Sequence, residues 1–178
     1  MVTPRLETLC TALAQVLIAR KLSMVTAESC TGGLIAASCT QLSGSSAWFE
    51  RGFVTYSNAA KSELLGVPAS LIEAQGAVSE EVAKAMALGA LAHSPAHISV
   101  AVTGIAGPTG GTDAKPVGTV WLAWAWRDSK QVLHSETLLR QFEGTRSEVR
   151  DATAELALAH LSELVGKLLE TTGKKIPT

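Results

Sequence analysis

Hydrophobic residues follow two different patterns along this chain. Spacings of three and four residues, typical of helices with one buried face, predict helices over 4–20, 34–39, 59–65, 79–92 and 145–169. Apolar runs rich in β-branched or aromatic residues predict strands over 24–27, 48–56, 98–102, 117–126 and 132–139. Helices interleaved with strands are typical of layered α/β folds. We therefore expect a three-layer α/β/α sandwich with a mixed sheet of about five strands.

Polar residues mark the boundaries of these elements. Thr3, Ser79 and Thr145 each stand where a helix N-cap is expected, and Thr145 forms a capping-box pattern with Glu148. The last two expected strands are separated only by Arg127-Asp128-Ser129-Lys130, which predicts an antiparallel hairpin.

Composition narrows the class of protein. The chain has 178 residues, and we expect a single domain over 1–170 with a loose tail over 171–178. Its 47% hydrophobic and 17% charged residues are typical of a globular protein, and a net charge of −1 argues against binding to nucleic acid or an anionic membrane. Three cysteines without a CxxC pair, together with no signal peptide or bilayer-length apolar run, favour the cytoplasm. We also expect a homo-oligomer.

The segment Ala27–Gly33 joins the first expected strand to the next helix and places Ser29 in the turn. Its two closing glycines permit close approach of a ligand, and the free N–H groups of a helix start favour a phosphate or an oxyanion. Ser29 is therefore a candidate nucleophile. The alternative is that Ser29 or Thr31 only caps the helix. Cys30 has no marked histidine partner and is expected to be a buried filler.

A serine nucleophile needs a base, and the sequence offers histidines and one well-placed lysine. None of the four histidines lies in a marked turn, and Pro95 interrupts the helix that His93 and His97 would need to form a metal pair. If Asn58 is an N-cap, Lys61 is the third residue of its helix, where the dipole and burial would lower its pKa. The alternative is an ordinary surface lysine.

Two further segments could contribute to the same site. Tyr56, the only tyrosine, ends an expected strand, where its hydroxyl could orient Lys61 or relay a proton, or its ring could simply pack. The loop Thr103–Gly111 follows a buried strand and contains four glycines, which suits a backbone cradle for a small ligand, although a bare turn is also possible. It has neither the P-loop ending nor a GxGxxG pattern, so no NTPase or dinucleotide fold is indicated.

Taken together, these segments resemble the CinA C-terminal domain family over roughly residues 5–168. The matching stretches are Ala27–Leu34, Tyr56–Lys61, Ala77–Ala83, Thr103–Pro108 and Lys115–Val120. The resemblance implies hydrolysis of nicotinamide mononucleotide to nicotinate mononucleotide and ammonia in pyridine-nucleotide salvage. It implies Ser29 as nucleophile, Lys61 as its base and Tyr56 assisting, with no metal and no cofactor.

The substrate expected from this resemblance is a small nucleotide. Candidate binding residues lie in the serine turn, the glycine-rich loop and the start of the last helix: Cys30, Thr31, Gly32, Gly33, Thr103, Gly104, Gly107 and Arg146. Arg146 with the glycine loop could hold the phosphate, or the helix after Ser29 could hold it instead.

Two positions depart from the family pattern. Ala106 stands where the family commonly has threonine, and Thr145 stands where an aspartate usually precedes the arginine. A non-catalytic nucleotide-binding module is the rival interpretation of the same loops. A DNA-binding role, suggested only by the family's name, is disfavoured by the near-neutral charge.

Overall fold

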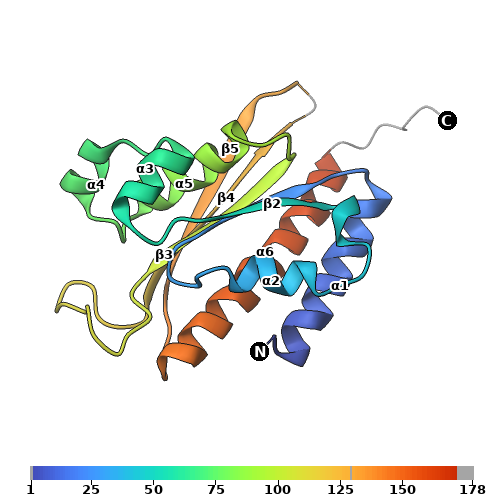
Figure 1. The fold of residues 1–178 in the computed structure, drawn as a ribbon. Coiled ribbons are helices and arrows are strands. Elements are labelled where there is room, and N and C mark those ends of the chain that lie inside the picture. The colour runs from blue at the N-terminus through green and yellow to red at the C-terminus, as the bar shows by residue number, and fades with distance from the viewer. Residues whose placement is uncertain (1, 129, 172–178) are drawn as a thin grey trace.

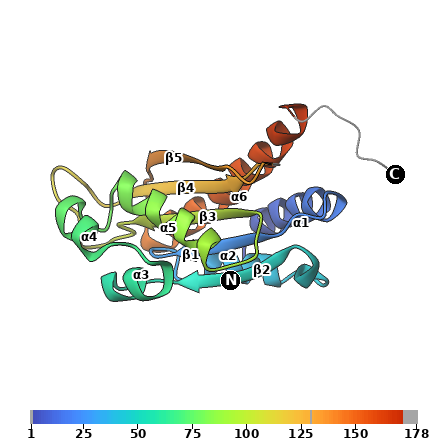
Figure 2. The same cartoon turned by 90° about the horizontal axis from the view of Figure 1, so that it is seen from above.

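A five-stranded mixed sheet forms the centre of the computed structural model, which describes residues 2–128 and 130–171 (Figure 1). Its strands lie in the order β2-β1-β3-β4-β5, with β2 and β5 at the two edges (Figure 2). β1 pairs in parallel with β2 and β3, whereas β4 is antiparallel to β3 and β5. The strands are β1 (Met24–Glu28), β2 (Phe49–Val54), β3 (Ile98–Gly104), β4 (Thr119–Arg127) and β5 (Leu133–Gln141).

Helices cover both faces of the sheet (Figure 1). One face carries α1 (Pro4–Ala19), α2 (Leu34–Thr40) and α6 (Arg146–Thr171), and the other carries α3 (Asn58–Leu65), α4 (Ala69–Gln75) and α5 (Glu80–Ala92). A short 3-10 helix spans Ser45–Ala47. Alternate residues of β3 divide between the two layers: Val100 and Val102 pack under α6, and Ala101 packs under α5. Among the described residues, no helix is long and apolar enough to cross a membrane.

The expected fold class and hairpin are confirmed. The Thr3, Ser79 and Thr145 caps are also confirmed, because each hydroxyl accepts a hydrogen bond from a backbone N–H three residues on. The expected tail over 171–178 lies outside the described residues except for Thr171, the last residue of α6.

Most expected bounds differ from the observed ones by one or two residues, and two of these differences lie next to the site. The second strand spans Phe49–Val54 rather than 48–56, and Trp48 precedes it as a fully buried core residue. The N-cap of α3 is Ser57 rather than Asn58, because the Ser57 hydroxyl accepts from the Ala60 N–H. Lys61 is consequently the fourth residue of α3 rather than the third.

Candidate active site

The carboxyl ends of the three parallel strands meet at one edge of the sheet, where α/β proteins commonly bind ligands. Ser29 follows β1, Tyr56 lies shortly after β2, and Thr103 and Gly104 end β3. A cavity of about 230 Å³ opens there. Its lining residues are Ser29, Cys30, Tyr56, Asn58, Lys61, Ala77, Val78, Thr103, Gly104, Ala106 and Arg146.

Ser29 and Lys61 form a buried pair in this cavity. Lys61 Nζ lies 2.9 Å from Ser29 Oγ and 2.9 Å from the carbonyl oxygen of Thr55, and the lysine is only 1% exposed. None of the ion pairs found among the described residues includes Lys61. Burial therefore lowers the pKa of Lys61. A neutral amine in this position donates to Thr55 and directs its lone pair at the Ser29 hydroxyl, which is the geometry of a serine with a lysine base.

The helix start after Ser29 already holds an anion, the carboxylate of Glu28. This side chain is fully buried and accepts hydrogen bonds from Thr31 Oγ1 (2.7 Å) and from the backbone N–H groups of Gly33 (3.0 Å), Ile35 (3.0 Å) and Ala36 (2.8 Å). The favourable interaction between a helix N-terminus and negative charge is thus satisfied inside the protein. These N–H groups are not available to a substrate phosphate, so we do not assign the phosphate to α2.

Glu28 should fix the turn that carries Ser29. We expect Glu28→Gln to lower the free energy of unfolding by about 2 kcal/mol or more, because an amide nitrogen would replace one acceptor oxygen among buried N–H donors. The rate of turnover should fall with it. Urea unfolding and kcat, measured beside the exposed-site control Glu63→Gln, test this. Equal stability of the Glu28 and Glu63 variants would contradict it.

The remaining residues of the serine turn shape the backbone. Gly32 and Gly33 have φ values of 61° and 93°, a left-handed conformation that favours glycine. Thr31 is buried, and its carbonyl accepts two hydrogen bonds from Arg150. These three residues do not line the cavity, whereas Cys30 does. Burial raises the pKa of the Cys30 thiol to about 12, so the thiol stays protonated beside the serine.

Tyr56 and Arg146 lie together at the cavity. Arg146 donates one hydrogen bond to the Tyr56 hydroxyl (2.8 Å) and another to the carbonyl oxygen of Gly107 (2.7 Å). The Tyr56 hydroxyl is therefore positioned by Arg146, and the Thr55 carbonyl rather than Tyr56 orients Lys61. The guanidinium keeps further N–H donors beyond these two bonds.

The glycine-rich loop contributes in ways that the sequence did not indicate. Thr103 donates to the carbonyl of Ala77 (2.8 Å), which draws the segment before α5 over the cavity. A Cβ atom on Gly104 would lie 2.8 Å from the Thr119 carbonyl oxygen, so this glycine allows β3 to pack against β4. Ala106 lines the cavity with a side chain that has no hydroxyl group.

Three contributions to the site were missed from the sequence: Glu28, Asn58 and Lys115. Asn58 lines the cavity beside Lys61, and Lys115 donates to the carbonyls of Val78 (2.7 Å) and Gln75 (3.2 Å). Lys115 thereby ties the loop to the segment that covers the cavity. Ser79, which caps α5 after this segment, also donates to the Gly76 carbonyl (2.9 Å).

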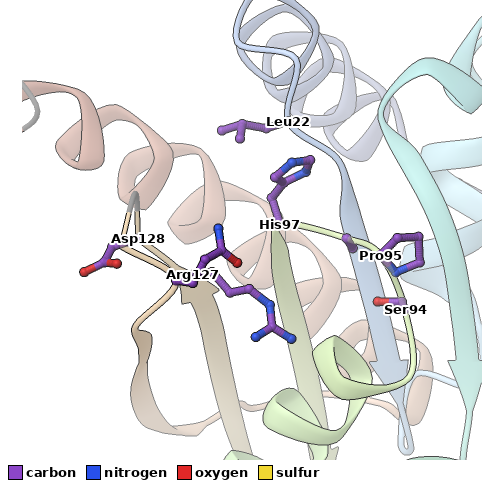
Figure 3. Close-up of a pocket in the computed structure, with 8 residues that line it drawn as sticks. Leu22, Ser94, Pro95, His97, Arg127 and Asp128 are labelled. Atoms are coloured by element: carbon purple, nitrogen blue, oxygen red, sulfur yellow. The ribbon is translucent and has the colours of Figure 1, made fainter.

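A larger hollow of about 600 Å³ lies at the opposite end of the sheet, where β3 begins and β4 ends (Figure 3). Its polar groups bond within the protein: His97 Nδ1 accepts from the Ser23 N–H, and Ser94 donates to the Ala90 carbonyl. No histidine lines the smaller cavity, and the described part of the chain holds no group of three potential metal ligands among its histidines, cysteines and acids. The serine and lysine pair makes the smaller cavity the candidate active site.

Comparison with known proteins gives one consistent result. The family model of the CinA C-terminal domain matches residues 6–165. A nicotinamide-nucleotide amidohydrolase PncC from Pseudomonas putida is 52% identical over 159 residues, covering 89% of this chain and 96% of the relative. The protein of the same name from Escherichia coli K12 is 48% identical over 149 residues, covering 84% of this chain and 88% of that relative. The crystal structure of the competence/damage inducible protein CihA from Agrobacterium tumefaciens has a TM-score of 0.84 at 43% identity, covering 92% of this chain and 98% of that one.

Proposed function

The chain belongs to the CinA C-terminal domain family, and we propose that it is a nicotinamide-nucleotide amidohydrolase that uses Ser29 as its nucleophile. Its substrate is nicotinamide mononucleotide, and its products are nicotinate mononucleotide and ammonia, a reaction of pyridine-nucleotide salvage. The similarity to proteins named for this activity supports the reaction. The buried contact between Ser29 and Lys61 is the observation that carries the mechanism.

The first half of the reaction forms an acyl-enzyme. Neutral Lys61 takes the proton of Ser29 as Oγ attacks the carboxamide carbon, and the carbonyl oxygen becomes an oxyanion. We assign this charge to backbone N–H groups of the turn after Ser29 other than those of Gly33, Ile35 and Ala36, which bond to Glu28. The intermediate collapses when the Lys61 ammonium gives its proton to the amide nitrogen. The carbon–nitrogen bond breaks, ammonia leaves, and an ester remains on Ser29.

The second half releases the acid. Lys61, neutral again, removes a proton from a water molecule that attacks the ester carbon. The second tetrahedral intermediate expels Ser29 Oγ, which recovers its proton from Lys61. Tyr56, with its hydroxyl positioned by Arg146, can donate a hydrogen bond to the reacting group. No step requires a metal or a cofactor.

Arg146 is the residue to which we assign the phosphate, through charge-assisted hydrogen bonds. Arg146→Ala should weaken binding of nicotinamide mononucleotide about tenfold or more and leave binding of the unphosphorylated riboside nearly unchanged. Calorimetric titration of both ligands into proteins that also carry Ser29→Ala separates binding from turnover. Arg20→Ala, on the exposed end of α1, is the matched control. Equal losses for the two ligands would reject the assignment.

Release of ammonia from nicotinamide mononucleotide by the purified protein tests the proposed reaction. We expect ammonia and nicotinate mononucleotide in equal amounts. A non-catalytic nucleotide-binding module would bind the nucleotide and release neither product.

A further inference from the structure

The outer edge of β5, a strand of nine residues, pairs with no other strand in the described part of the chain. One of its outward groups, the Leu139 carbonyl, accepts a hydrogen bond from the Arg140 guanidinium (3.0 Å), which a partner strand would replace. Hydrogen bonds from the Asp128 N–H to the Val132 carbonyl and from the Phe142 N–H to the Gly118 carbonyl lie at the two ends of the hairpin. In an antiparallel pair the residues that bond to the neighbouring strand alternate, so the even-numbered residues of β5 bond to β4. The odd-numbered residues from Leu133 to Gln141 therefore direct their N–H and carbonyl groups away from the sheet.

This edge lacks the features that usually prevent strand pairing. It contains no proline and no lysine, and its register with β4 runs without a bulge from Thr119–Gln141 to Arg127–Leu133. Leu133 and Leu139 are 48% and 46% exposed. A long, regular and partly apolar edge is a template for another strand.

We propose that β5 pairs with β5 of a second copy of this chain, antiparallel and around a two-fold axis at Leu138. The two five-stranded sheets then become one continuous sheet across the dimer. An antiparallel pair around a two-fold axis is closed, so it leaves neither β5 edge open to further chains. This pairing of β5 strands does not depend on the proposed reaction.

Among the registers in which the two β5 strands overlap over most of their length, the charged side chains favour this one. Centring the axis on Glu136 would place two carboxylates directly opposite each other. Centring it on Thr137 would place Glu136 opposite Leu138 and Arg140 opposite His134, and centring it on Leu139 would place them opposite Phe142 and Leu138, so neither register pairs Glu136 with Arg140. Centring the axis on Leu138 places Glu136 of each copy opposite Arg140 of the other copy. The two Leu138 residues then lie opposite each other. Opposite charges across neighbouring strands stabilise the pair, and like charges destabilise it.

The side chains of Glu136, Leu138 and Arg140 lie on one face of the sheet. Leu138 packs against the core under α6, and Glu136 bonds to His160 of α6. The alternate side chain of Thr137 bonds instead to Glu80 of α5 on the opposite face. The two inter-chain ion pairs would therefore flank Leu138 on the α6 side.

Charge reversal tests the register. Wild type should sediment as a dimer, and Glu136→Arg and Arg140→Glu should each raise the dimer dissociation constant about tenfold or more. An equal mixture of the two variants should form heterodimers, because each arginine then faces a glutamate. Native mass spectrometry identifies the heterodimer, and thermal unfolding shows that each variant is folded. A monomeric wild type, or variants that dimerise like wild type and do not prefer each other, would overturn the proposal.

A second pair of variants tests the backbone contribution. Thr137→Pro removes an outward N–H group and should yield monomers, whereas Thr137→Val keeps this N–H and should remain dimeric. Both variants lose the hydroxyl contact with Glu80, so the comparison isolates the backbone group. Equal dimerisation of the two variants would exclude pairing through this edge.

Discussion

Replacement of Ser29 by alanine should lower kcat for ammonia release more than about a hundredfold while the fold survives. The change removes the proposed nucleophile, and among the described residues the hydroxyl makes one side-chain hydrogen bond, with Lys61. The backbone of the turn is held separately by Glu28 and by the glycines. Steady-state kinetics together with thermal unfolding of the same preparation measure both effects.

Ser94→Ala is the matched control, because it removes a serine hydroxyl at the opposite end of the sheet. It should leave kcat near the wild-type value. A Ser29→Ala protein that retained more than about a hundredth of the wild-type kcat would remove Ser29 from the chemistry.

Replacement of Lys61 by arginine should be nearly as damaging as replacement by alanine. A lysine that accepts the Ser29 proton must be neutral, and burial lowers its pKa toward the range where this is possible. Arginine keeps the positive charge but does not lose its proton in proteins. Both variants should therefore lose the base, and kcat/KM should fall about a hundredfold or more in each.

The pH dependence of kcat/KM tests whether Lys61 acts as the base. Below its lowered pKa, Lys61 carries a proton and cannot accept another, so kcat/KM of the wild type should rise with pH through that pKa and then level off. The Lys61→Arg protein should lack this rise. Lys84→Arg, at an exposed position of α5, should keep the wild-type profile. An arginine variant at position 61 within about tenfold of wild type would leave Lys61 as an electrostatic anchor.

Local sequence signals were sufficient for most of the fold. The apolar runs identified the strands, and the hydroxyls of Thr3, Ser79 and Thr145 form the caps that their positions predicted. The second strand was predicted too long because the aromatic Trp48 resembles a strand residue, whereas its ring is buried before β2 begins. Burial in the assembled core is not visible in a short window of sequence.

Of the residues expected at the site, Ser29, Lys61, Tyr56 and Arg146 line one cavity, whereas Thr31, Gly32, Gly33 and Gly107 do not. The sequence predicted that the α3 dipole and burial would lower the pKa of Lys61, with burial as the larger cause, and burial is confirmed as the main cause. Glu28 was missed because an acid at the end of an apolar strand resembles an exposed strand terminus. Its role depends on four donors that only the folded turn brings together.

The acyl-enzyme on Ser29 is the most direct test of the central claim. Protein mixed with excess nicotinamide mononucleotide, quenched in acid during turnover and analysed by intact mass, should carry an adduct equal to the substrate less ammonia. Fragmentation should locate the adduct on Ser29, and the Ser29→Ala protein should carry none. An adduct on Cys30, or ammonia release at the wild-type rate by Ser29→Ala, would contradict the mechanism.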